Sequence, residues 1–131
     1  MRPHYGIETS LLFNRATGVV GARDGYTVVR SPELPDFYFG NLLVLPGRPR
    51  DAGRALLEAD FARLIGAPPR INHRTFMWPV FDDDPQAGAA LDDWLAAGYE
   101  YDEYPVLLAE AGDLRAPPHA CPGLSIRAYD G

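Results

Sequence analysis

Short β-type segments that end at proline or glycine alternate with two stretches of helical periodicity, and this alternation constrains the fold most strongly. Runs of β-branched, aliphatic and aromatic residues between turn residues are typical of strands. By this criterion we expect strands at residues 26–30, 37–45, 71–78, 99–109 and 124–129. The resulting order, β-β-α-β-α-β-β, favours an α/β fold with a mixed, partly parallel sheet and right-handed crossovers.

Two of the expected strands and both ends of the chain allow more detailed expectations. Residues 37–45 are aromatic and aliphatic almost throughout, so we expect burial on both faces of that strand. Pro105, inside 99–109, indicates an edge strand or a bulge. Residues 1–24 are poorly defined by pattern, and 11–13 could form either a short strand or a helical turn. We expect one domain over residues 1–131, with a Pro-rich connector at 111–123 before the final strand.

The first expected helix follows the break at residues 46–49. Asp51 is a suitable N-cap, and Gly66 is suited to ending the helix. Arg54 and Glu58 are spaced to form an i,i+4 ion pair. The apolar face consists of Leu57, Phe61, Leu64 and Ile65.

The second expected helix has clear boundary signals at both ends. Asp84 is suited to the N-cap, Pro85 to the first helical position and Gly98 to the C′ position. Its apolar stripe consists of Ala87, Ala90, Leu91, Trp94 and Leu95.

Charge and composition exclude several classes of function. The 131 residues include 12 basic residues, all arginine, and 18 acidic ones, for a formal net charge of −6. An acidic chain is poorly suited to neutralising phosphates, so we expect no nucleic-acid partner. Lysine-based catalysis is excluded because the chain has no lysine. The single cysteine, the lack of a membrane-length apolar run and the polar N-terminal segment favour a cytoplasmic protein without membrane contact.

No catalytic residue and no metal ligand is assigned from the sequence. Asp82, Asp83 and Asp84 are adjacent and do not converge on one ion, so a solvated loop with a helix cap is expected. The histidines, His4, His73 and His119, are scattered, and Cys121 has no base near it in sequence. Two interpretations remain for the acidic residues Glu100, Asp102, Glu103 and Glu110: an edge strand guarded against pairing, or an acidic wall for a cationic amine substrate.

Two stretches resemble the GNAT acyltransferase superfamily. The first is residues 43–57, where a strand ending before Pro46 leads through Arg48 and Gly53 into a helix. The second is residues 91–100, similar to the family's late helix and the strand after it. Segments 37–43, 94–99, 117–119 and 124–127 together resemble the N-terminal half of two-part bacterial GNAT proteins, covering about residues 8 to 131. This resemblance implies a degenerate or partial acyl-CoA N-acyltransferase fold.

The family holds the pyrophosphate of acyl-CoA at a helix N-terminus, where glycines let backbone N–H groups approach the anion. Arg48 and Gly53 match that motif, but Pro49 removes an N–H donor and Asp51 places a carboxylate where the anion would bind. Trp94 occupies the position of the family's usual tyrosine acid, and an indole cannot replace a phenol there.

The resemblance therefore leads to two hypotheses. The first is a non-catalytic GNAT-like module without a bound cofactor, which associates with a C-terminal catalytic GNAT domain or with itself. The alternative is a small N-acetyltransferase that uses acetyl-CoA and an amine. A small-ligand binding protein is a third possibility. If a degenerate pyrophosphate loop still binds the cofactor, the residues concerned are Leu43, Val44, Arg48, Arg50, Gly53 and Arg54.

Overall fold

A computed structural model describes residues 3–85, 91–115, 122, 123 and 125. The helices are α1 (Tyr5–Thr17), α2 (Arg54–Leu64) and α3 (Asp92–Ala96). The strands are β1 (Val19–Arg23), β2 (Tyr26–Arg30), β3 (Leu42–Val44) and β4 (Phe76–Met77). Three single 3-10 turns are η1 (Tyr38–Gly40), η2 (Asp51–Gly53) and η3 (Ala111–Asp113). Within the described ranges, no helix is both long and apolar enough to cross a lipid bilayer.

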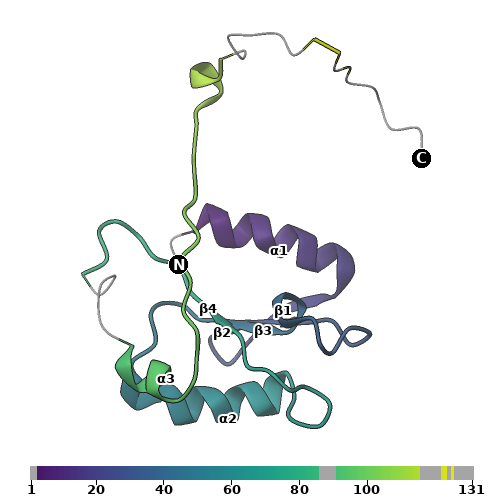
Figure 1. The fold of residues 1–131 in the computed structure, drawn as a ribbon, viewed down its shortest axis with the longest axis vertical. Helices are drawn as coiled ribbons and strands as arrows, with labels where there is room; N and C mark the ends of the chain where they lie inside the picture. The colour runs from purple at the N-terminus through teal and green to yellow at the C-terminus, as the bar shows by residue number, and fades with distance from the viewer. Residues whose placement is uncertain (1–2, 86–90, 116–121, 124, 126–131) are drawn as a thin grey trace.

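The strands form one mixed sheet in the order β1-β2-β3-β4 (Figure 1). The pairs β1–β2 and β2–β3 are antiparallel, whereas β3 and β4 run parallel. Asp24 and Gly25 form the β1–β2 turn with φ angles of 54° and 84°, as two-residue hairpin turns require. The expectation of an α/β chain with a mixed, partly parallel sheet is confirmed.

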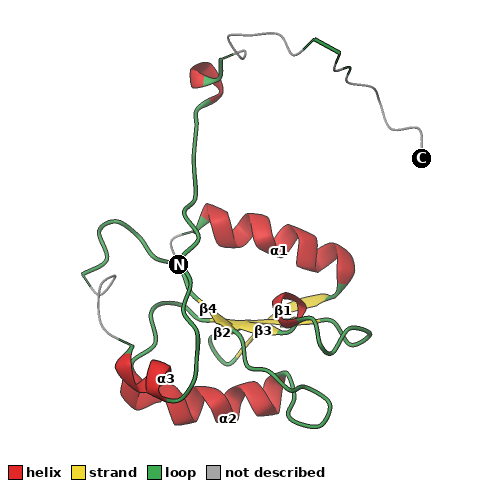
Figure 2. Ribbon diagram, in the orientation of Figure 1, coloured by secondary structure: helices red, strands yellow, loops and turns green. Residues whose placement is uncertain are grey.

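The helices cover both faces of this sheet. Figure 2 shows α1 on one side and α2 with α3 on the other. β3 is buried on both faces, as expected: Leu42 and Val44 pack with the α1 side, and Leu43 with the α2 side. The side chains that are almost fully enclosed are Phe61, Leu43 and Val29, and each stabilises the fold by roughly 1.5–3 kcal/mol through burial.

The α2 helix confirms most of its sequence pattern. Its inward residues Leu57, Phe61 and Leu64 are buried, as is Ile65 just after its end. Gly66 then follows with a φ of 149°, a conformation that favours glycine. The expected cap is wrong, because Asp51 lies inside the turn η2 and the helix begins at Arg54 without a side-chain cap.

The α3 helix is shorter than expected. It begins at Asp92, whereas Asp84 lies in a turn in which its N–H donates to the carbonyl of Phe81. Residues 86–90, including Ala87 and Ala90 of the expected stripe, lie outside the described residues. Leu91 and Trp94 are buried as expected, but Leu95 is 51% exposed.

The C-terminal boundary of α3 is confirmed by its geometry. Gly98 has a φ of 92°, and its N–H donates to the carbonyl of Leu95. The next N–H, that of Tyr99, donates to the carbonyl of Trp94. This pair of bonds is the Schellman motif that a glycine at C′ favours.

Other expectations are wrong in ways that change the element order. The N-terminal 24 residues contain α1 and β1, so the described chain runs α-β-β-β-α-β-α. Only residues 42–44 of 37–45 and residues 76–77 of 71–78 form strands. Residues 99–109 form no strand, because no described segment pairs with their backbone. All of the expected strand 124–129 except residue 125, and residues 116–121 of the connector, lie outside the described residues.

Candidate functional site

The carboxyl ends of the parallel strands β3 and β4 are where an α/β sheet of this kind would hold a ligand. Leu43 pairs with Phe76 and Val44 with Met77, and the N–H of Leu45 donates to the carbonyl of Met77 at 2.7 Å. Pro46 and Pro79 then follow in the two segments. Proline has no N–H for a ladder, so the pairing ends there. Residues 45–53, which we name the β3–α2 loop, begin at this edge.

Two backbone donors at the junction of the β3–α2 loop and α2 are used in a local turn. The N–H of Gly53 donates to the carbonyl of Arg50 at 3.0 Å, and the N–H of Arg54 donates to the backbone carbonyl of Asp51. A pyrophosphate held at the start of α2 would need these two N–H groups as donors. A Cβ built on Gly53 would meet nothing within 4 Å, so this glycine is not required by a close contact within the protein.

Leu43 and Val44, the first two residues of the candidate cofactor set, are core residues. Leu43 is fully enclosed and Val44 is 7% exposed. Their side chains pack inside the two layers and are not available to a ligand, although their backbone leads into the loop. These two side chains therefore lie in the core, whereas Arg50 of the same set is exposed.

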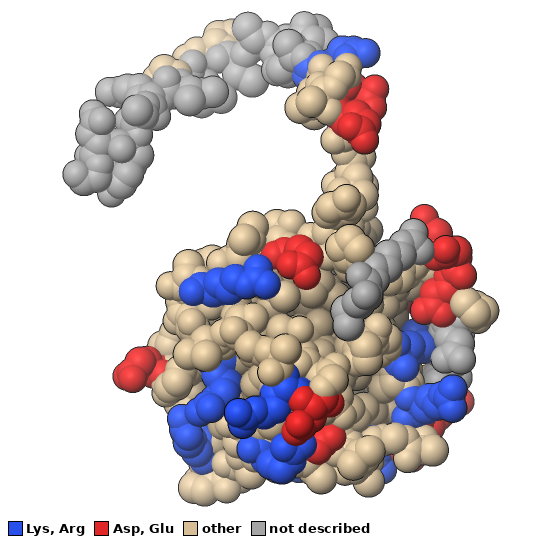
Figure 3. All heavy atoms as spheres, turned by 180° about the vertical axis from the view of Figure 1, so that it is seen from behind, with Lys and Arg blue, Asp and Glu red and all other residues tan. Residues whose placement is uncertain are grey.

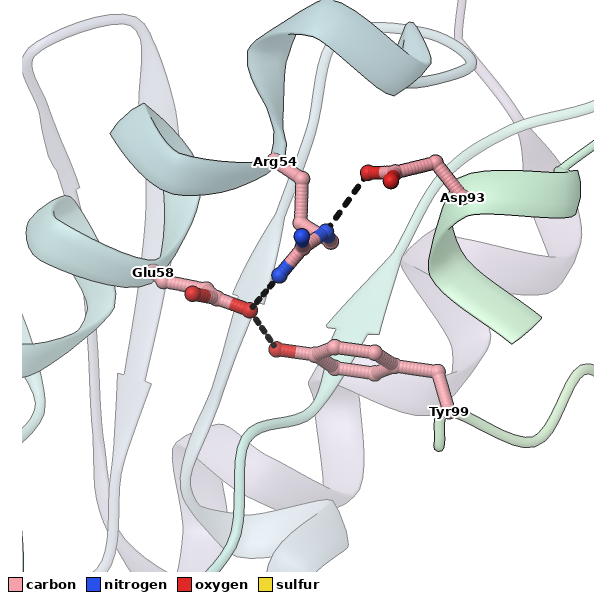
Figure 4. A network of polar contacts seen from close by, with 4 residues as sticks. All are labelled: Arg54, Glu58, Asp93 and Tyr99. Carbon is pink, nitrogen blue, oxygen red and sulfur yellow. Dashed lines mark hydrogen bonds and ion pairs between the residues drawn. The ribbon is translucent and has the colours of Figure 1, made fainter. Parts of the chain in front are cut away.

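Arg54 lies between two carboxylates (Figure 4). Its Nε donates to Asp93 at 2.7 Å and its Nη1 donates to Glu58 at 3.0 Å. The hydroxyl of Tyr99 donates to the same oxygen of Glu58 at 2.9 Å. We name Arg54, Glu58, Asp93 and Tyr99 the α2–α3 network, because it fastens α3 to the first turns of α2.

These contacts shift the pKa values of Arg54 and Glu58. The hydrogen bond to Asp93, and then that to Glu58, raises the pKa of Arg54. Burial favours the protonated form of Glu58, but the hydrogen bonds from Tyr99 and Arg54 outweigh it and its pKa is lowered. Arg54 is thus a cation whose charge is balanced by two carboxylates inside the protein, and a phosphate would have to compete with both.

Arg48 and Arg50 differ in their surroundings. The Arg48 guanidinium carbon lies 5.7 Å from the centre of the Tyr101 ring, and Tyr101 stacks on Trp78 with an interplanar angle of 8°. Burial, followed by the hydrogen bond to Glu103, raises the pKa of Tyr101. Arg50 is exposed on the surface of the loop. The three arginines therefore differ in their contacts: Arg48 lies over Tyr101, Arg54 is bound by two carboxylates, and Arg50 is at the surface.

Trp94 is a core side chain. It is 5% exposed and meets the rings of Phe76 and Tyr99 edge-on, with centroids 5.5 and 4.9 Å away. The sequence placed Tyr99 in an expected strand and did not predict the hydrogen bond that its hydroxyl donates to Glu58 in the α2–α3 network. Burial and the bond to Glu58 raise its pKa, which makes it a weaker proton donor. The Gly-Tyr pair at the end of the helix was the available signal for it.

A groove of about 380 Å³ lies on the α1 side of the same sheet edge. It is lined mainly by apolar groups, among them Ile7, Leu11, Val44, Pro46 and Pro79, with His4 at its edge. Both ring nitrogens of His4 have a backbone partner: Nδ1 accepts from the N–H of Ile7 at 3.3 Å, and Nε2 lies 3.3 Å from the carbonyl oxygen of Val80. Within the described residues, no three His, Cys, Asp or Glu side chains form a group that could hold a metal ion.

Acid should weaken the folded state through the carboxylates on α2. The pKa of Asp60 is lowered first by the hydrogen bond from Arg63 and then by that from Tyr26, and the pKa of Glu58 is also lowered. A depressed folded pKa adds stability above the unfolded value, near 4 for carboxylates, and this contribution is lost as the pH falls through the folded pKa. We therefore expect the urea midpoint to fall steadily between about pH 5 and pH 3.

The matched variants are Glu58→Gln with Asp60→Asn, and Glu33→Gln as a control at an exposed carboxylate. The double variant should flatten the decline in urea midpoint, whereas the control should follow the wild type. An equal acid slope in all three proteins would contradict the assignment of these carboxylates.

Comparison of the chain with protein-family models, with curated proteins and with solved structures finds no match.

Proposed function

We propose that this chain is a non-catalytic GNAT-like module, the N-terminal portion or a remnant of an acetyltransferase, which works by association with a catalytic domain or with a second copy. The observation that carries the proposal is the internal neutralisation of Arg54 by Asp93 and Glu58. A loop that holds a pyrophosphate needs free backbone donors and uncompensated positive charge. The N–H of Gly53, at the end of the β3–α2 loop, and that of Arg54, at the start of α2, donate within a local turn, and the Arg54 side chain is paired with carboxylates.

Association is supported by apolar side chains that the described residues do not cover. In the extended segment after α3, Leu107 is 93% exposed, Leu108 69% and Tyr104 69%. Figure 1 shows this segment leaving the body of the protein beyond the level of α1. Neighbouring exposed apolar groups of this size mark an interaction surface more often than a solvated one.

One observation favours the alternative of an acetyl-CoA-dependent N-acetyltransferase. The groove of about 380 Å³ reaches the carboxyl ends of β3 and β4, which is where such a reaction would be placed. Direct attack by a bound amine needs positioning more than a strong acid. This activity would be detected as acetyl-CoA-dependent release of a free thiol in the presence of amines.

Isothermal titration of the full chain with acetyl-CoA tests the proposal. We expect no binding heat at ligand concentrations up to about 1 mM, which corresponds to less than about 4 kcal/mol of binding free energy. The reason is that a phosphate would have to displace Asp93 or Glu58 from Arg54.

Arg48→Gln provides the control for this titration. Binding in the micromolar range that is lost in Arg48→Gln would contradict the proposal and support the enzyme. Heat that is unchanged by Arg48→Gln would also contradict it, and would place the ligand away from the β3–α2 loop.

A further inference from the structure

The helix α1 is apolar on two opposite faces. Its inner face consists of Ile7, Leu11 and Asn14, which are buried against the sheet. On the opposite face Tyr5 is 62% exposed, Leu12 63% and Phe13 62%. The outer face of a helix that covers a sheet is normally charged or polar. We name the exposed set Tyr5, Thr9, Leu12, Phe13 and Ala16 the outer face of α1.

The hydroxyl groups near this face are already satisfied. The side chain of Thr9 donates to the carbonyl of Tyr5 at 2.8 Å, that of Ser10 to Gly6 at 3.0 Å, and that of Thr17 to Phe13 at 3.1 Å. Each hydroxyl therefore has a partner four residues earlier in its own helix. A partner could cover the outer face without leaving these donors unpaired, so burial there carries little polar cost.

The charges beside the outer face are self-complementary. Glu8 and Arg15 lie two helical turns apart on one margin, and their side chains are 53% and 49% exposed and 3.8 Å apart. The described face contains no charge between its apolar residues. In Figure 3, blue side chains are most frequent in the lower half of the body, and a blue and a red group lie side by side in a broad uncharged stretch of its upper half.

An antiparallel second copy of α1 matches this arrangement. A two-fold axis near Leu12 places Arg15 of each copy opposite Glu8 of the other and brings the two Leu12 side chains together. A parallel arrangement would instead place the two charged margins on opposite sides of the contact, where Glu8 of one copy could not meet Arg15 of the other. A membrane surface is a poorer match, because helices that lie on bilayers carry several basic residues on the polar face, and this margin pairs one arginine with one glutamate.

We propose that the outer face of α1 is the contact surface of a two-fold homodimer, with Leu12 at its centre and two Glu8–Arg15 pairs along one margin. This inference rests on the proposed function, since it names the surface and the partner through which the module associates. The apolar residues of the outer face recur at i, i+7, i+8 and i+11, and the pairing of two helices through such a face is an ordinary mode of association.

The central test compares Leu12→Glu with Leu56→Glu. Leu56 is the matched control because it is an exposed leucine on another helix, at 65% exposure against 63% for Leu12. Sedimentation equilibrium of the full chain should give a dimer whose dissociation constant rises roughly a hundredfold in Leu12→Glu, because a carboxylate would be buried at the axis. Leu56→Glu should leave the constant unchanged.

A charge-exchange series tests the orientation. Glu8→Arg should weaken the dimer by several-fold to about tenfold, since each Arg15 would then face an arginine. The double variant Glu8→Arg with Arg15→Glu should restore it. If the double variant is weaker than the single one, the antiparallel arrangement is wrong.

Cross-linking keeps the proposal testable if Leu12→Glu does not fold. With Cys121 replaced by serine, Leu12→Cys should form a disulfide-linked dimer on mild oxidation, and Leu56→Cys should not. A wild-type chain that stays monomeric at several hundred micromolar, or equal cross-linking at both positions, would overturn the proposal.

Failure of this inference can be distinguished from failure of the proposed function. A wild-type dimer that is equally stable in Leu12→Glu would overturn the α1 contact and leave association through another surface in place. Binding of acetyl-CoA in the titration above would overturn the non-catalytic assignment, whatever the oligomeric state.

Discussion

Replacing Asn41 with leucine is expected to lower the free energy of unfolding by about 3 kcal/mol, because leucine cannot bond the three backbone groups that the buried Asn41 side chain satisfies. Asn41 is 3% exposed. Its side-chain oxygen accepts from the N–H of Ser31 at 3.0 Å, and its amide donates to the carbonyls of Leu34 and Phe37 at 2.8 and 2.9 Å. The loop between β2 and β3 is organised around this side chain.

Urea unfolding followed by tryptophan fluorescence measures the effect. Asn72→Leu is the control, because the Asn72 side chain is exposed and donates to one carbonyl, that of Pro69. We expect its unfolding free energy to change by less than about 0.5 kcal/mol. Equal losses in Asn41→Leu and Asn72→Leu would show that the hydrogen bonds of Asn41 contribute no more than those of a surface amide.

The sequence predicts α2 and β2 well and α1 poorly, and the reason is the distribution of apolar residues. In α2 the buried residues Leu57, Phe61 and Leu64 recur at the i, i+4 and i+7 spacing of one helix face, which predicts a helix there. In α1, Leu11 is buried while Leu12 and Phe13 beside it are exposed. The apolar run that results is equally compatible with a short strand, and sequence alone left both possibilities open.

Residues 99–109 show the limit of composition as a guide to strands. Their aromatic and aliphatic residues have high β-propensity, which measures how well a side chain fits a sheet that already exists. A strand also requires a neighbouring backbone, and the described residues supply none. Tyr99 and Tyr101 still pack their rings against Phe76 and Trp78 of the β4 region, so the side-chain contacts form without the ladder.

The position of the candidate site follows from local sequence, whereas its charge balance does not. The strand, loop and helix around Arg54 are contiguous and were identified from residues 43–57. Asp93 is 39 residues from Arg54, and Tyr99 is 41 residues from Glu58. Only the packing of α3 on α2 brings these groups together, so the neutralisation of Arg54 could not be predicted from spacing.

Phe61 of α2 and Trp94 of α3 belong to the same buried core. We expect Phe61→Ala to destabilise the protein by about 4 kcal/mol. Phe61 is 1% exposed and lies edge-on to the rings of Phe76 and His73, with centroids 5.6 and 6.2 Å away. Removing the ring leaves a cavity between α2 and β4 and takes away a large apolar area. A loss of this size is a large fraction of the 5–15 kcal/mol that stabilises a typical domain.

Leu56→Ala on the same helix is the control, since Leu56 is 65% exposed and its removal opens no cavity. Urea unfolding at constant pH should give a change of less than about 0.5 kcal/mol for Leu56→Ala. If Phe61→Ala costs less than about 1.5 kcal/mol with an unchanged urea dependence, the α2–β4 contact is not part of a close-packed core. The α2–α3 network would then lack the rigid support that holds Arg54 between its two carboxylates.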